Sequence, residues 1–419
     1  MLVSRPTLLQ DTLGLLLGGV FFLLSFQPMI LDGLEVWAAL VFTLQLGFLI
    51  LRNMPSWQVA VFLLFCLTYP LVFLLAKYLQ VPYHYLLHYQ DPKLELILIS
   101  NGIIFFSLFF WGITSKRSKI PLTLQTTDRS LYWLSLCAAG GFILLGVVAA
   151  WPPVLTGYSV ESNSSSLFEY AVIPAVICVL VAHTPREKKL LYFLILIGII
   201  TPLLFARRGV SIIFFVILFH QVTKKIKNPW LIFASLFAAY LGFRVFALAR
   251  GDIAFSVAAF FGMHSDAGLS NHQGGVIVSS VTYLGLIDTG LWDIYFRIQS
   301  ALGLFFAPFL PSSLNPFPQV FLHLEALKVA SIPGSGGFPF VFLFVWGGVG
   351  YVIIGALAMR WALFNTYINP SLTCAKLIIL VSFPRWYAYS LPVGFKYFLM
   401  ALIISAILMS LRRRSVQDA

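Results

Sequence analysis

The sequence predicts an all-α polytopic membrane protein with about twelve transmembrane helices, and three observations lead to this fold class. First, 60% of the 419 residues are hydrophobic and only 10% are charged, with a mean hydropathy of +0.92, which is too apolar for a soluble fold of this length. Second, apolar runs of roughly 20 residues recur along the chain, separated by short polar clusters. Third, the basic residues gather in those clusters, as the positive-inside rule describes.

The apolar runs give the order of the predicted helices. They lie at about 12–31, 34–51, 57–79, 94–114, 131–151, 168–183, 189–206, 209–222, 229–248, 338–363, 371–388 and 393–411. No compositional break divides the chain, so residues 1–419 are expected to form a single integral membrane domain. When twelve spans are counted, the strongest basic clusters (116–119, 186–189, 224–227 and 412–414) all fall on one side, which predicts that both termini are cytoplasmic.

One connection on the opposite side is much longer than the others. Residues 249–337 separate the ninth and tenth predicted helices, and loops of this length are uncommon unless they have a function. Three apolar stretches within it, 253–261, 276–286 and 301–310, predict short helices that lie against the membrane surface or dip into it. The loop is therefore expected to form a packed outer cap over an active site.

Composition and motifs also argue against several function classes. The net charge of +12 comes from clusters between helices, so the chain is not expected to bind nucleic acid. Its four cysteines lie inside apolar runs without metal-ligand spacing and are expected to be buried thiols. HExxH, acidic metal-binding runs and the DxD signature are all missing, so no metal or other cofactor is predicted, and a nucleotide-sugar transferase is disfavoured.

Several arginines occur where the positive-inside rule does not place them. Arg207 and Arg208 fall at the outer membrane face on the twelve-span count, where they would suit a lipid phosphate or diphosphate, unless a miscounted span puts them in the cytoplasm. Arg244 and Arg250 follow near the outer end of the ninth predicted helix and are candidates to line a cleft there. The alternative for Arg250 is a surface ion pair with Asp252, which would contribute little energy.

Other outer residues have the chemistry of a glycan site. The cap carries many titratable groups, His272 and Arg297 among them, that could transfer protons or stabilise phosphate, although a solvated surface role is the simpler explanation for any one of them. Tyr83, Tyr85 and Trp386 lie in aromatic segments on the same side. They are either part of the interfacial aromatic belt or a stacking platform for sugar rings.

Three features together resemble the O-antigen polymerase (Wzy-type) family of bacterial oligosaccharide repeat-unit polymerases. The first is the junction Ala206-Arg207-Arg208-Gly209 before an apolar helix. The second is the large outer loop with Arg250, Arg297 and the proline-rich stretch 307–311. The third is the glycine-marked helix that follows the loop, in which 334–339 leads into Trp346-Gly347-Gly348-Val349-Gly350-Tyr351.

The resemblance implies a fold related to multi-span glycosyltransferases and a location in the bacterial cytoplasmic (inner) membrane. It implies metal-independent transfer of a growing glycan from undecaprenyl diphosphate to a new lipid-linked repeat unit, building O-antigen or capsule. It also implies a chain-length co-polymerase and a flippase as partners, besides membrane lipid.

Within this mechanism, arginines at the membrane face would stabilise charge developing on the leaving diphosphate. We assign this role to Arg207, Arg208 and Arg250, with Arg244 and Arg297 as further diphosphate-binding candidates. Asp252 and His272 are candidates for the base that takes the proton of the acceptor hydroxyl, which gives Arg250, Asp252 and His272 as the predicted catalytic set.

Two other functions remain open at this stage. An O-antigen ligase has similar topology and attacks the same kind of lipid diphosphate, but joins finished polymer to lipid A-core. A lipid-linked oligosaccharide flippase or other transporter is expected to carry charged residues within its helices along a central path, whereas the sequence concentrates candidate charges in one outer loop.

Overall fold

The computed structural model describes most of the chain as helix. The described residues are 5–27, 33–53, 56–79, 91–113, 129–153, 167–205, 208–223, 272–288, 293–306, 314, 316–317, 336–364, 370–388 and 391–417. Within them every regular element is a helix, and six helices are long and apolar enough to cross a membrane. The all-α membrane architecture predicted from the sequence is therefore confirmed at this level.

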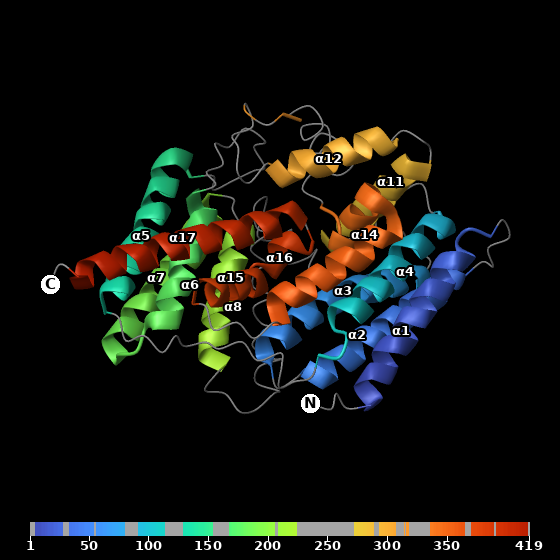
Figure 1. The fold of residues 1–419 in the computed structure, drawn as a ribbon, viewed down its shortest axis with the longest axis horizontal. Helices are drawn as coiled ribbons and strands as arrows, with labels where there is room; N and C mark the ends of the chain where they lie inside the picture. Colours follow the sequence, from blue (N-terminus) through green and yellow to red (C-terminus); the bar gives the residue numbers. More distant parts are fainter. Residues whose placement is uncertain are drawn as a thin grey trace. The chain divides into compact units, whose positions relative to one another are not determined.

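The chain divides into two compact units, and the single integral membrane domain stays a prediction. Unit 1 comprises Met1–Ile120, Gly268–Ile368 and Ser382–Leu399, and unit 2 comprises Pro121–Ala267, Asn369–Val381 and Met400–Ala419. The helices of each unit are coloured along the sequence in Figure 1.

Unit 1 is built around a single buried helix. Its helices are α1 (Arg5–Leu24), α2 (Leu34–Asn53), α3 (Trp57–Tyr78), α4 (Pro92–Phe109), α11 (His272–Asp288), α12 (Ile294–Phe306), α14 (Pro339–Phe364), α16 (Phe383–Trp386) and the first residues of α17 (Leu391–Gln417). Every residue of α4 from Leu94 to Phe109 is buried, because α1, α2, α11 and α14 pack around it. This central position suits a helix that is apolar on nearly all sides.

Unit 2 repeats this arrangement with fewer helices. It contains α5 (Arg129–Ala150), α6 (Leu167–Val181), α7 (Pro185–Leu204), α8 (Arg208–Thr223), α15 (Pro370–Val381) and the rest of α17. The central helix is α6, which packs against α5, α7, α8 and α15 and is buried from Ala171 to Val181. At the start of α7, Thr184 and Glu187 form a capping box that satisfies backbone N–H groups of the first turn.

Most of the described helices lie close to the positions that the hydropathy pattern predicts. The first helix runs from Arg5 to Leu24 instead of 12–31, because its polar start at Asp11 is accommodated by an ion pair. The predicted helix 229–248 lies outside the described residues. Helices α6, α8 and α15 are shorter than the roughly 20 residues that a perpendicular span needs.

Helix α14 differs from its prediction, because it is not one straight helix. Gly347 (φ −156°, ψ 25°) and Gly348 (φ 67°, ψ −163°) break it into residues 339–346 and 349–364. Leu343 and Gly355 are twelve residues apart, about 18 Å along a straight helix. A Cβ atom built on Gly355 would nevertheless lie 2.5 Å from Cδ1 of Leu343, so the chain reverses at the two glycines.

Part of the expected cap is core. Helix α11 falls within 249–337, yet residues 274–281 are buried and the helix packs against α3, α4 and α14. The Ser280 hydroxyl accepts a hydrogen bond from the backbone N–H of Phe338 (3.3 Å) just before α14 begins. The stretch 276–286 is therefore covered on several sides by protein and does not merely lie against the membrane surface, whereas its predicted dip into the membrane stays a prediction.

Three of the four cysteines match the prediction. Cys66, Cys178 and Cys374 are buried free thiols, whereas Cys137 on α5 is exposed, so the prediction for Cys137 is wrong. The apolar run around Cys137 does not reveal which face of α5 packs inward, and the packed face contains Tyr132, Ser135 and Ala139.

Candidate functional site

The helices of unit 1 have two distinct ends. At one end, the start of α1 meets the ends of α2 and α4, because Asp11 contacts Arg52 and the backbone N–H of Gly112. The end of α1 lies at the opposite end, where Phe22 packs edge-on against Phe344 with ring centroids 5.9 Å apart. Helix α12 lies across α14 at this second end, which we call the α12 end (Figure 1).

Arg297 links α12 to the reversal in α14. Its Nε donates to the backbone carbonyl of Val345, and its Nη2 donates to that of Phe344 across 3.2 Å. The break at the two glycines leaves the last backbone carbonyls of residues 339–346 without N–H donors from a following helical turn. The Arg297 guanidinium donates the missing hydrogen bonds to these carbonyls. Positive charge at a helix C-terminus is also favoured by the helix dipole.

The start of α12 places Arg297 in this position. The carboxylate of Asp293 accepts a hydrogen bond from the backbone N–H of Phe296 (2.7 Å), which caps the helix and begins it one turn before Arg297. The Arg297 side chain is half-buried, and this burial lowers its pKa below the ordinary value for arginine. A guanidinium keeps its charge under such conditions because its ordinary pKa is so high.

A second charged cluster lies at the same end of the same helix bundle. Lys77, at the end of α3, is 2.7 Å from Oε2 of Glu95 and 3.5 Å from Oε1 of Glu35. Glu35 and Glu95 lie in the first turns of α2 and α4, and both are buried. Each carboxylate is at a helix N-terminus and the ammonium is at a C-terminus, so every charge of this cluster complements its own helix dipole.

Sequence reasoning missed these buried charges. Asp11, Arg52, Glu35 and Glu95 each interrupt an apolar run, and ionisable residues inside membrane helices are uncommon enough to be a usable signal. Lys376, buried in α15 of unit 2, belongs to the same class. The expectation that charges concentrate in the outer loop therefore left out these helix charges, which in unit 1 pair at helix ends instead of following a central path.

The residues predicted from sequence are only partly placed. Six lie outside the described residues: Tyr83, Tyr85, Arg207, Arg244, Arg250 and Asp252. Arg208 is the first residue of α8 in unit 2 and His272 is the first of α11 in unit 1, and the description of both is limited to the backbone. Arg297 is thus the one predicted phosphate ligand whose side-chain contacts are described.

Trp386 has a packing role. Its side chain is buried, its ring centroid is 5.5 Å from that of Phe62, and Gly394 at the start of α17 lies against its Cβ and ring. A stacking platform needs an open ring face, so the position of Trp386 does not fit the predicted contact with a glycan.

Within the described ranges, no three His, Cys, Asp or Glu side chains come close enough together to hold a metal ion. Comparisons with protein families, curated proteins and solved structures found no match to this chain. A function for this protein is therefore inferred from its own residues and from the sequence resemblance described above.

Proposed function

We propose that this protein polymerises undecaprenyl-diphosphate-linked oligosaccharide repeat units into a surface polysaccharide, O-antigen or capsule, at the outer face of a bacterial cytoplasmic membrane. The observation that carries the proposal is the contact between Arg297 and the carbonyls of Phe344 and Val345. Arg297 and the glycine-marked helix are separate features of the sequence resemblance, about fifty residues apart, and here they form one substructure.

The chemistry of the reaction suits an arginine in this setting. Transfer of the glycan breaks the bond between sugar and diphosphate, and negative charge develops on the leaving oxygen. A fixed cation at the end of a membrane-helix bundle stabilises that charge more in the transition state than in the ground state. Arg297 is fixed by Val345 and Phe344, and its guanidinium has five N–H donors, of which these contacts use two.

The remaining steps are assigned to residues from the sequence. Arg207, Arg208, Arg244 and Arg250 are proposed, from the sequence resemblance, to bind the diphosphate. Asp252 or His272 is proposed to take the proton from the acceptor hydroxyl as it attacks the anomeric carbon. His272 begins α11, which belongs to the same unit as Arg297.

The test is the surface-glycan profile of a strain that lacks this protein, compared with strains restored with the parent chain, Arg250→Ala or Arg250→Lys. Loss of the polymer ladder, with one repeat left on the core, is expected. Arg250→Lys should restore little polymer because lysine lacks the planar fork of donors. Full polymer from the strain with Arg250→Ala would contradict the assignment of Arg250 to the active site. An unchanged glycan profile in the deletion strain would contradict the polymerase proposal.

The same experiment separates two alternatives. If complete polymer accumulates on its lipid carrier and never reaches the core, the protein is a ligase. A flippase is the second candidate, because such a protein is expected to carry charged residues within its helices; unit 1 has Asp11, Arg52, Glu35, Lys77 and Glu95 there, although they pair at helix ends and do not follow a central path. Loss of the protein would then leave repeat units on the inner leaflet, inaccessible to sugar-specific reagents outside the cell.

A further inference from the structure

Helix α12 is amphipathic, but its apolar face is exposed and its polar side chains are turned toward the protein. The side chains on its exposed face are all apolar: Ile294, Tyr295, Ile298 and Leu302, with 66%, 67%, 50% and 40% of their surface exposed. Tyr295, Ile298 and Leu302 follow Ile294 by one, four and eight positions, so in an α-helix the four side chains lie within an arc of about 100°. The side turned toward the protein carries Arg297 and the buried Ser300.

This arrangement would be unfavourable in water. A helix on the surface of a soluble protein turns its apolar face inward and its polar face to solvent. The exposed face of α12 contains no charged residue, and burying it would gain roughly 25 cal/mol for each Å² of apolar surface. An apolar phase must therefore cover it.

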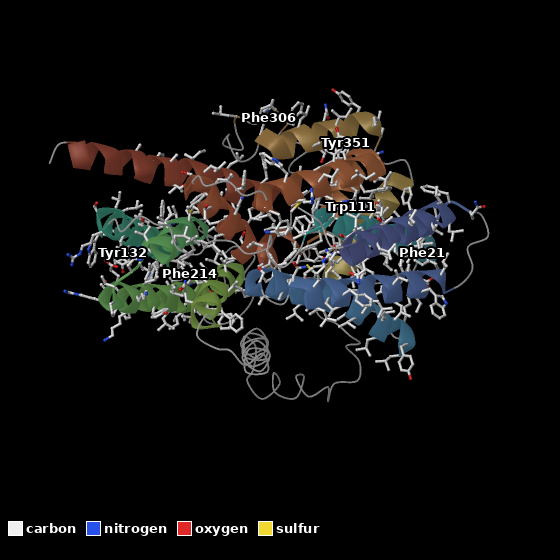
Figure 2. All side chains as sticks on the ribbon, turned by 60° about the horizontal axis from the view of Figure 1, so that its bottom comes forward. Phe21, Trp111, Tyr132, Phe214, Phe306 and Tyr351 are labelled. Atoms are coloured by element: carbon white, nitrogen blue, oxygen red, sulfur yellow. The ribbon has the colours of Figure 1, made fainter. Side chains whose placement is uncertain are left out.

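The position of α12 identifies that phase as the bilayer. Arg297 joins it to residues 344 and 345, and Phe344 contacts Phe22 near the end of α1. Helix α1 and residues 349–364 of α14 also expose apolar side chains, among them Leu9, Leu13, Leu16, Val20, Leu23, Ile354, Leu357 and Trp361. The apolar face of α12 thus lies where the lipid-facing surfaces of two long membrane helices reach the end of unit 1 (Figure 2, where Phe306 and Tyr351 mark α12 and α14).

We propose that α12 is a membrane-docking helix, seated along the edge of the bilayer at the α12 end with Ile294, Tyr295, Ile298 and Leu302 among the acyl chains. The helix has 13 residues and is about 20 Å long, too short for the roughly 30 Å hydrocarbon core. It therefore lies in the interface, where the ring of Tyr295 is favoured. Arg297, which lies outside this face, holds the docked helix to the reversal of α14.

The test measures lipid contact and is independent of the proposed polymerase activity. A Cys137→Ser chain serves as background, because the other three cysteines are buried. An environment-sensitive fluorophore is attached to Ile298→Cys, to Leu16→Cys as an acyl-chain reference, and to Lys188→Cys as an exposed polar reference. The proteins are reconstituted in phosphatidylcholine vesicles with nitroxide lipids that place the quencher near the headgroup or near the chain ends.

We expect the Ile298 label to be quenched several-fold more by the shallow nitroxide than by the deep one, and to resist aqueous iodide. The Lys188 label should show the opposite, with strong iodide quenching and little lipid quenching. A label at Ile298 that behaves like the one at Lys188 would overturn the proposal. Protection from both iodide and nitroxide lipids would also overturn it, because protein, such as a second copy of this chain, would then cover the face.

Discussion

Arg52 on α2 donates from Nη1 to Oδ1 of Asp11 on α1 across 2.8 Å, and both side chains are almost completely buried. The second oxygen of Asp11 accepts from the backbone N–H of Gly112 (2.8 Å), and Nη2 of Arg52 donates to the carbonyl of Phe110 (2.9 Å). One ion pair thus fastens α1, α2 and the end of α4 together, and both of its members have further hydrogen bonds.

Removing one member of this pair should be costly. Asp11→Ala leaves the Arg52 guanidinium buried without its counter-ion, and such changes cost about 3 to 5 kcal/mol. The double variant Asp11→Ala, Arg52→Ala should lose less than the sum of the two single variants, because no isolated charge remains. If the stability lost by the double variant equals the sum of the losses of the two single variants, Asp11 and Arg52 have no coupling energy.

The chain provides its own probe for this measurement. In the Cys137→Ser background, the three remaining thiols are buried and should react with a thiol-specific dye only when the protein unfolds. The temperature at which dye fluorescence rises in detergent micelles then reports the stability of each variant. If the dye reacts fully with the folded Cys137→Ser chain, these three cysteines are accessible and not buried.

The positions of most helices were predictable because hydropathy reports directly on burial in a bilayer or in a core. The sequence could not separate these two apolar environments: α11 has the composition of a surface-dipping segment, yet it packs against α3, α4 and α14. The reversal at Gly347-Gly348 was also hidden, since 338–363 reads as one continuous apolar run. Glycine pairs permit such a break, but tertiary contacts decide whether it occurs.

The candidate site was predictable in residue type but not in partnership. Arg297 stood out as a charge in the outer loop, whereas its contacts with Phe344 and Val345 join segments almost fifty residues apart. The same limit applies to Lys77, Glu35 and Glu95, which lie in three different predicted helices. Pairing of this kind depends on which helix faces meet, and hydropathy periods do not specify that.

The Lys77 cluster leads to a graded prediction. Lys77→Met leaves two buried carboxylates near each other without a cation, so it should destabilise the protein most, by about 3 kcal/mol or more. Glu95→Gln should cost more than Glu35→Gln, because the distance to Lys77 is 2.7 Å for Glu95 and 3.5 Å for Glu35. The dye-unfolding temperatures should follow this order, and a larger loss for Glu35→Gln would contradict the relative strength of the two contacts.

The capping box of α7 predicts a dependence on pH. The backbone N–H groups of Thr184 and His183 donate to Glu187 (both 3.0 Å) and lower the pKa of its carboxyl group. Stability from a lowered pKa is present above the unfolded-state pKa, about 4.3 for glutamate, and is lost as the pH falls through the lower folded-state value. Glu187→Gln should therefore be less stable than the parent chain at neutral pH, and the difference should shrink below about pH 4.

A matched variant distinguishes this linkage from a general loss of helix structure. Thr184→Ala removes the other half of the capping box, the hydroxyl that accepts from the Glu187 N–H (3.3 Å), without removing a titratable group. Its cost, about 1 kcal/mol, should be much less dependent on pH. If the stability difference between the parent chain and Glu187→Gln stays constant from neutral to acidic pH, the negative charge of Glu187 does not contribute to stability.

The reversal of α14 gives the most specific prediction, because three neighbouring glycines differ in what an added methyl group would meet. Gly348 has φ 67°, the left-handed region, where alanine costs about 1 to 2 kcal/mol. Gly347 has an extended φ, but a Cβ there would lie 1.9 Å from Cδ2 of Tyr351, so Gly347→Ala must displace that ring. Gly350 has open space around its Cβ position and an ordinary φ.

We therefore expect Gly350→Ala to be neutral or slightly stabilising, since alanine is favoured over glycine by about 1 kcal/mol within a helix. Gly348→Ala and Gly347→Ala should both lower the unfolding temperature. Adding Tyr351→Ala removes the ring that the new methyl group would displace, so it should recover part of the unfolding temperature lost in Gly347→Ala. It should recover none of the loss in Gly348→Ala, where the strain is in the backbone. If all three alanine variants behave alike, α14 is a continuous helix and the carbonyls that Arg297 contacts are not freed by a break.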